Sequence, residues 1–243
     1  MIVAYLIYDM PSLWTCSRTC YSWDIAAVPH LHYNLLIDTK CWAQKLRRPN
    51  RLRTLGVLPL VEVFLVRSND SSYVFSRGQF NRSILRQFST LNSVQRLVRD
   101  YLDIPSFMPE VRRYFGHFLP TVQDLALGKP KGSRRQVIYF IGMFQHLEQL
   151  ELFCDGANSQ EDPADDLTLL PPFVPPLRGL LKVGYFARVH LLEDMIDLFG
   201  GFRFRHMDLF DVDGMRLLDA GADPLETLRL YPTDPRGGEA SEY

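Results

Sequence analysis

The feature of this chain that most restricts its fold is a short apolar phrase that returns along its length. The phrases are LVEVFLV (60–66), SVQRLV (93–98), TVQDLAL (121–127), HLEQLELF (146–153), LRGLLKV (177–183), RFRHMDLF (203–210) and PLETLRLY (224–231). Four of them share one skeleton of apolar, two polar, apolar, one variable and apolar residues. Their equivalent centres are taken as Phe64, Leu97, Leu125, Leu150, Leu180, Met207 and Leu228, with separations of 33, 28, 25, 30, 27 and 21 residues. Periods of this length are typical of stacked repeats, with room for one strand and one helix in each.

The segments between the phrases carry apolar residues at helical spacing. These segments are residues 80–88, 137–144, 191–199 and 215–218, and Gly200 with Gly201 follows the third of them as glycines do at a helix C-terminus. Parallel strands joined by helices need right-handed crossovers, and a unit that cannot bury its apolar side alone must stack on its neighbours. The sequence therefore predicts an α/β fold, a leucine-rich-repeat-like solenoid with a curved parallel sheet and outer helices.

Two stretches are expected to differ from this array, which we place over residues 31–232. Residues 154–176 are polar and then rich in proline, which predicts a long loop whose last part is extended. Residues 233–243 predict a frayed tail.

The N-terminal stretch LWTCSRTCYSW raises the question of a zinc site, because two histidines follow it closely. A helix over residues 12–27 would place Leu13, Cys16, Cys20, Trp23 and Ala27 in one stripe. Beyond Pro29 a period of two is expected, with Leu31, Tyr33, Leu35 and Ile37 on one side and His30, His32 and Asn34 on the other. The thiols then point into a core and the imidazoles toward solvent, so we expect no metal.

The charge balance differs between the two halves of the chain. Residues 1–135 hold 19 Lys and Arg against 9 Asp and Glu, and residues 136–243 hold 8 against 19. The basic residues do not form a dense run with interleaved aromatics, so we interpret them as solvated surface and expect neither nucleic acid nor membrane as a partner. Four cysteines in 243 residues suit a reducing compartment, which predicts the cytoplasm or the nucleus.

Two motifs with known chemistry are present only in incomplete form. GKPKGS (128–133) lacks the Lys that a phosphate loop needs after its second Gly, and we interpret it as a turn. DVDG (211–214) lacks the later ligands of a calcium loop, so Asp211 or Asp213 is expected to cap a helix. We expect no catalysis and no cofactor.

A partner would meet the variable positions of the strand phrases, because these face away from the core. They are Arg96, Asp124, Gln149, Glu151, His206, Asp208, Thr227, Arg229 and Tyr231. This set mixes both signs of charge, which suits a protein partner better than a phosphate polymer.

The phrases taken together resemble a known family. LWTCSRTCYSW followed by PHLHYNLLI resembles the last helix of a fungal F-box and the strand after it, with Leu13, Cys16, Cys20 and Trp23 at the matching positions. FGHFLPTVQDLAL, FIGMFQHLEQLEL, PPFVPPLRG, GGFRFRHMDLF and LETLRLYPTDPRG resemble recurring phrases of the irregular leucine-rich-repeat-like array in the same fungal F-box-like proteins.

The resemblance implies a substrate receptor of a cullin-RING ubiquitin ligase. A partial F-box over residues 1–30 would dock on a Skp-type adaptor, and the array would hold the protein to be ubiquitinated. The Leu-Pro-x-Glu phrase that opens a complete box is absent, and Met10 and Pro11 are its only trace. A second hypothesis is therefore kept: a free-standing repeat scaffold that has lost adaptor binding.

Overall fold

The structure is a computed structural model of the chain of 243 residues. It describes residues 9–31, 33–38, 58–67, 91–100, 102, 104–110, 115–153, 170–184, 189–201, 203–210 and 225–231. The helices expected over 80–88 and 215–218, the cap at Asp211 or Asp213, most of the long loop and the C-terminal tail lie outside these ranges.

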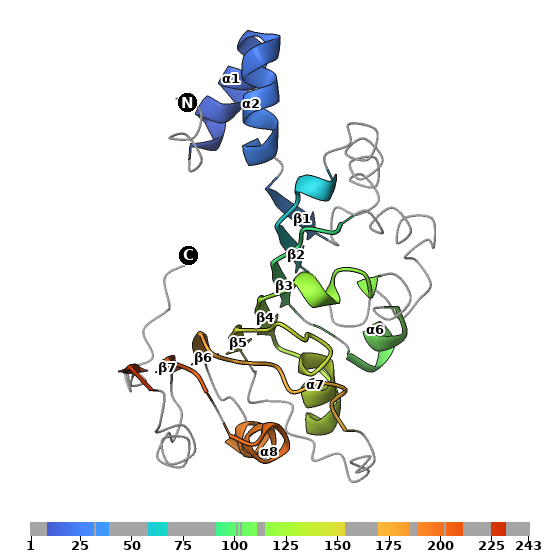
Figure 1. Ribbon diagram of the computed structural model, residues 1–243, viewed down its shortest axis with the longest axis vertical. Helices are drawn as coiled ribbons and strands as arrows, with labels where there is room; N and C mark the ends of the chain where they lie inside the picture. The colour runs from blue at the N-terminus through green and yellow to red at the C-terminus, as the bar shows by residue number, and fades with distance from the viewer. Residues whose placement is uncertain are drawn as a thin grey trace.

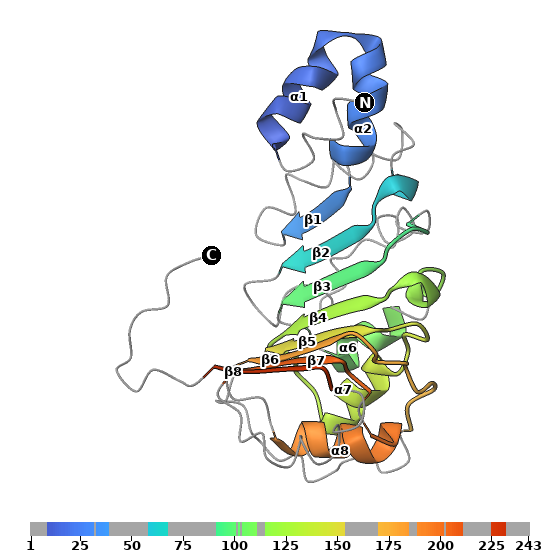
Figure 2. The same ribbon diagram turned by 60° about the vertical axis from the view of Figure 1, so that its left-hand side comes forward.

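Among the described residues, eight strands form one sheet in which every neighbouring pair is parallel (Figure 2). The spatial order β1 to β8 follows the order of the chain. This confirms the predicted α/β class with a parallel sheet. The strands are β1 (Asn34–Asp38), β2 (Val63–Arg67), β3 (Arg96–Asp100), β4 (Asp124–Gly128), β5 (Gln149–Phe153), β6 (Leu180–Gly184), β7 (His206–Phe210) and β8 (Thr227–Tyr231).

The sheet is curved, and its outer side carries the helices α6, α7 and α8 (Figure 1). Helices were expected at the last two of these three places, whereas the short α6 was not predicted. Two 3-10 turns, η3 and η6, precede β2 and β4. The bounds are η3 (Leu58–Leu60), α6 (Ile104–Glu110), η6 (Leu119–Thr121), α7 (Arg134–Ile141) and α8 (Val189–Phe199).

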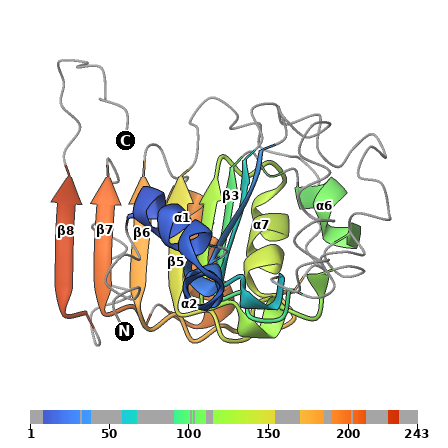
Figure 3. The same ribbon diagram turned by 90° about the horizontal axis from the view of Figure 1, so that it is seen from above.

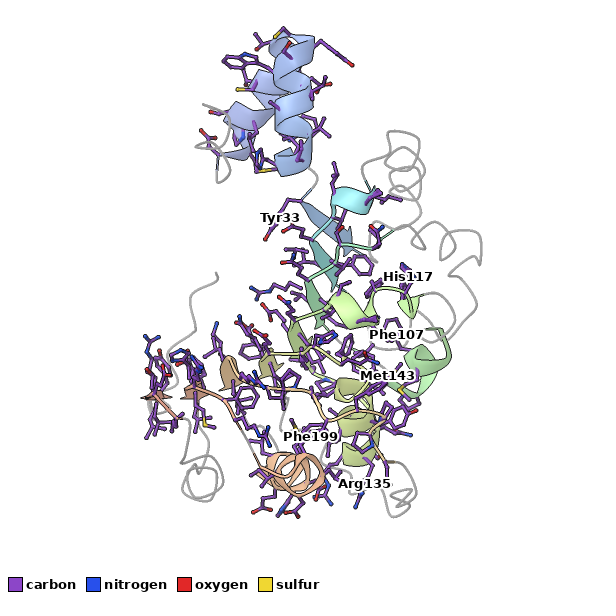
Figure 4. The ribbon with its side chains drawn as sticks, viewed as in Figure 1. Tyr33, Phe107, His117, Arg135, Met143 and Phe199 are labelled. Atoms are coloured by element: carbon purple, nitrogen blue, oxygen red, sulfur yellow. The ribbon has the colours of Figure 1, made fainter. Side chains whose placement is uncertain are left out.

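The core lies between the sheet and the outer helices. Each strand has five residues, and the second of them faces the helices in each strand from β2 to β7. These residues are Phe64, Leu97, Leu125, Leu150, Leu181 and Met207, all buried. Figure 4 labels Phe107, Met143 and Phe199 on the same side of the sheet, where they belong to the same apolar cluster.

One predicted repeat centre is wrong by one residue. Leu181, and not Leu180, lies beside Leu150 of β5 and Met207 of β7 in the sheet register. Leu181 is fully buried, whereas Leu180 is half-buried and lies on the opposite face. LRGLLKV carries two adjacent leucines, and in a strand of period two only one of them can point into the core.

A pair of backbone hydrogen bonds to one carbonyl is found at the start of β2, β3, β4, β5, β7 and β8. The carbonyl of Glu62 accepts hydrogen bonds from the N–H groups of Gln95 at 2.8 Å and Arg96 at 3.0 Å. The carbonyl of Gln123 accepts in the same way from Glu148 at 2.8 Å and Gln149 at 2.9 Å. These paired bonds satisfy polar backbone groups at the turns into these strands and hold consecutive units in register.

Local sequence explains the ends of the two longer outer helices. Ser133 accepts a bond from the Gln136 N–H, and the Gln136 side chain accepts one from the Ser133 N–H, which is a capping box at the start of α7. At the end of α8, Gly200 has φ 73° and the Gly201 N–H donates to Ile196 O at 2.8 Å, as in a Schellman motif. The predicted C-terminal glycines of this helix are therefore confirmed.

The N-terminal stretch forms two helices, α1 (Met10–Thr19) and α2 (Tyr21–Leu31), where one helix was predicted (Figure 3). Cys20 interrupts them in an extended conformation, with φ −161° and ψ 164°. The two helices pack against each other beyond the β1 edge of the sheet (Figures 1 and 2).

The predicted stripe is divided by this break. Leu13 packs with Ala27 and Leu31 between the helices, and Cys16 is also buried. Cys20 and Trp23 are exposed, so they do not share a buried face with Leu13. A single helix was the wrong prediction because apolar spacing is the same for one long helix and for two helices in succession, while the break depends on packing. Leu31 also belongs to α2 and not to the strand that follows.

No helix in the described part of the chain is long and apolar enough to cross a membrane.

Candidate partner-binding face

The inner side of the curved sheet is the face that the outer helices leave open (Figure 1). The first, third and fifth residues of β4 to β8 belong to it, together with Arg96 of β3, because alternate residues of a strand point to opposite faces. All nine predicted partner-binding residues stand at such positions in the register. We call this surface the inner face.

Four charged side chains form a connected cluster on the inner face. Arg96 of β3 places Nε 3.3 Å from Asp124 Oδ2 and Nη2 3.5 Å from Glu151 Oε1. Lys182 of β6 donates from Nζ to the same Glu151 oxygen at 3.1 Å. Two cations and two carboxylates balance, so the cluster stabilises its own geometry and carries no net charge.

Burial raises the pKa of Asp124 above its ordinary value of 3.8. The neighbouring Glu151 carboxylate raises this pKa further, whereas Arg96 and, less strongly, Lys182 lower it. The Asp124 side chain is 17% exposed, and its Oδ1 is enclosed with no hydrogen-bond partner in the described structure. Asp124 is therefore ionised at a cost that its ion pair with Arg96 does not fully offset.

Substitution of Asp124 with asparagine is expected to remove a pH dependence of stability. Because the folded state binds the Asp124 proton more tightly than the unfolded state, the native protein loses stability as the pH rises from 3.8 through the raised folded pKa. Relative to the native protein, Asp124→Asn should therefore gain stability over that interval. Urea unfolding between about pH 3.5 and 7 measures it, and a pH-independent difference would contradict the assignment.

Asp9 provides a comparison of opposite sign. The side chain and the N–H of Ser12 donate to its carboxylate and lower its pKa. A lowered folded pKa adds stability above the unfolded value that is lost as the pH falls. As the pH rises from the lowered folded pKa to the ordinary value of 3.8, Asp9→Asn should therefore lose stability relative to the native protein.

The second part of the inner face lies on β7 and β8. It carries His206, Asp208, Thr227, Arg229 and Tyr231, of which Asp208 is buried and Arg229 exposed. In the register, Asp208 lies between Lys182 on β6 and Arg229 on β8. The predicted residues thus divide into two groups. Arg96, Asp124 and Glu151 belong to the ion-pair cluster, and the five residues of β7 and β8 form the second group. Gln149 is exposed beside the first group, on β5.

The fifth strand positions form an aromatic row beside the charged groups. Phe210 of β7 and Tyr231 of β8 stack with their ring centroids 4.2 Å apart and their planes at 6°. On β6 the matching residue is Gly184, and a Cβ there would lie 2.5 Å from Cδ1 of Phe153. Glycine therefore allows the Phe153 ring to lie over β6, and aromatic side chains stand at the fifth positions of β5, β7 and β8.

Sequence reasoning missed Lys182, Phe153 and Phe210. With Leu180 taken as the core residue, Lys182 falls on the core side of β6 and is excluded from the inner face. The alternation of Leu181, Lys182 and Val183 is the signal that would have found it. The two phenylalanines end their strand phrases and were not assigned to a face, although they follow Glu151 and Asp208 by two residues.

The chemistry of this face is that of polar recognition. It offers cations, carboxylates and aromatic rings in close sequence, whereas a nucleic-acid surface requires a continuous basic track. Within the described ranges, no three His, Cys, Asp or Glu side chains are grouped so that they could hold a metal ion. GKPKGS, which the sequence predicts to be a turn and not a phosphate loop, ends in the Ser133 cap of α7.

Comparison with known proteins returned no matching family model, no matching curated protein and no matching solved structure.

Proposed function

We propose that this chain is a non-enzymatic protein-interaction module, the substrate receptor of a Skp-cullin-F-box ubiquitin ligase. The inner face carries the proposal, because it presents charged and aromatic side chains from neighbouring strands on an open, curved surface. Polar groups next to exposed Tyr and Arg are the composition of protein interfaces. The strand order and the outer helices support the finer description of the fold as a leucine-rich-repeat-like solenoid.

The helical pair α1 and α2 supports a docking end for the Skp-type adaptor. Several large apolar side chains of the pair are exposed, namely Met10, Trp14, Tyr21, Trp23 and Ile25. An open hollow lies next to Trp14 and is lined also by Thr15, Arg18 and Thr19. Exposed aromatic side chains gathered on one small unit favour a protein partner.

A second candidate is the free-standing scaffold. It is favoured by the separation of the two surfaces: the inner-face clusters lie on β3 to β8 and take no side chain from α1 or α2. A client could therefore bind without an adaptor. The two candidates differ only in whether the helical pair has a partner.

Co-elution of the full chain with purified Skp adaptor tests the choice. We expect a stable complex, and we expect Trp14→Ala combined with Ile25→Ala to weaken it by about tenfold or more, because exposed aromatic and large apolar side chains contribute most at interfaces. Both residues are at least half exposed, at 50% and 56%, so the fold should not change.

The control variant is Gln149→Ala, which alters an exposed side chain on the inner face and should leave adaptor affinity unchanged. If the unmodified chain does not co-elute with the adaptor, the receptor proposal fails and the scaffold remains.

A further inference from the structure

Asp208 is a carboxylate buried on the inner face of β7. Its residue is 7% exposed, and within the described part of the chain its side chain makes no hydrogen bond or ion pair. Neither of its oxygens is among the fully enclosed atoms without a partner, so each keeps some exposed surface. A carboxylate in this position is largely desolvated and has no hydrogen-bond donor among the described residues. A ligand that supplies such a donor would therefore stabilise it.

The neighbouring cations do not fill this role. Lys182 of β6 is the register partner of Asp208 in the sheet. Its Nζ, however, donates to Glu151 Oε1 at 3.1 Å. Arg229 is the neighbour on β8, and it is exposed to solvent. Among the described residues, Glu151 therefore pairs with two cations, Arg96 and Lys182, while Asp208 pairs with none.

The aromatic row lies next to Asp208 on the same face. Phe210 follows Asp208 by two residues on β7, and its ring stacks on Tyr231. Tyr231 is 40% exposed, so part of this stacked pair is open to solvent. A carboxylate beside aromatic rings suits a basic side chain, whose apolar stem lies along the rings while its charged head meets the carboxylate.

We propose that β7 and β8 form a subsite for a basic side chain, arginine or lysine, of the protein held on the inner face, with Asp208 as its anionic contact and the Phe210–Tyr231 pair as its apolar wall. The subsite rests on the proposed function in that it names the chemistry of the client. It does not depend on the adaptor, since none of its residues belongs to the helical pair.

Peptide binding to the full chain tests the subsite. The probes are acetyl-Gly-Arg-Gly-Arg-Gly-amide and the same peptide with glutamine in place of both arginines, titrated while the backbone amide resonances are observed. We expect the arginine peptide to shift the resonances of β7 and β8 and the glutamine peptide to leave them unchanged. Higher ionic strength should weaken the binding, because the contact is between charges.

Two variants with opposite expected effects make the test specific. Asp208→Asn should weaken binding of the arginine peptide by about tenfold, as loss of one charge-assisted hydrogen bond does. Arg229→Gln should strengthen it, because a like charge next to the subsite is removed. Glu226→Gln is the matched control. The Glu226 carboxylate lies just before β8, is exposed, and places Oε1 3.8 Å from Arg205 Nε. The affinity for the arginine peptide should therefore not change.

Equal binding of the two peptides, or an unchanged affinity in Asp208→Asn, would overturn the subsite. This result is distinct from failure of the receptor proposal, which is decided by adaptor co-elution. A chain that binds the arginine peptide and not the adaptor would retain the subsite and act as a scaffold.

Discussion

Replacement of Phe115 with alanine is expected to lower the free energy of unfolding by about 3–5 kcal/mol. Its ring is buried and lies 6.2 Å from Phe64, 5.9 Å from Phe107 and 5.4 Å from Phe118, measured between centroids. Alanine would leave a cavity. The three neighbours belong to β2, α6 and the turn before β4, so they cannot all move to fill it.

Urea unfolding followed by circular dichroism measures the loss, provided that different probes give coincident transitions, because repeat arrays can unfold in parts. His117→Ala is the control. Its ring lies against the edge of Phe118 at 5.4 Å but is exposed, so a change within about 0.5 kcal/mol is expected. A similar small change for Phe115→Ala would mean that the aromatic cluster does not hold the outer helices to the sheet.

The alternation of apolar and polar residues within the strand phrases allowed most of the correct predictions of the strands and of the residues on the inner face. In QLELF, Leu150 and Leu152 are apolar and Glu151 between them is polar, and the structure buries the two leucines on one face and places Glu151 on the other. A period of two has only two phases, so a polar residue between two buried ones is assigned to the open face with little ambiguity. The inner-face residues were predicted in this way without knowledge of their neighbours.

The contacts among those residues could not be predicted in the same way. Arg96 and Glu151 are 55 positions apart, and their ion pair depends on the register of two strand pairs that no local pattern specifies. The burial of Asp208 likewise results from its neighbours on β6 and β8 and not from the phrase HMDLF. Pairing and burial across a sheet are tertiary properties, so a sequence predicts the face of a residue before it predicts the partner.

The two groups on the inner face differ in what they leave for a ligand. Arg96, Asp124, Glu151 and Lys182 are joined by ion pairs, so a partner would have to break existing ion pairs to use them. Asp208 and Arg229 make no such pairs within the described structure. Binding energy is therefore expected mainly from β7 and β8, with the cluster on β3 to β6 acting as a fixed polar border.

A matched pair of substitutions on β6 tests the register that separates the structure from the sequence prediction. Leu181→Ala is expected to cost about 2–5 kcal/mol of unfolding free energy, because this side chain is fully buried between Leu150 and Met207. Leu180→Ala removes the same atoms from a half-buried position on the inner face and should cost about 1 kcal/mol or less. Urea unfolding of both variants under one set of conditions gives the comparison. The sequence-based assignment predicts the reverse order, so a larger loss for Leu180→Ala would show that β6 is shifted by one residue and that Lys182 points into the core.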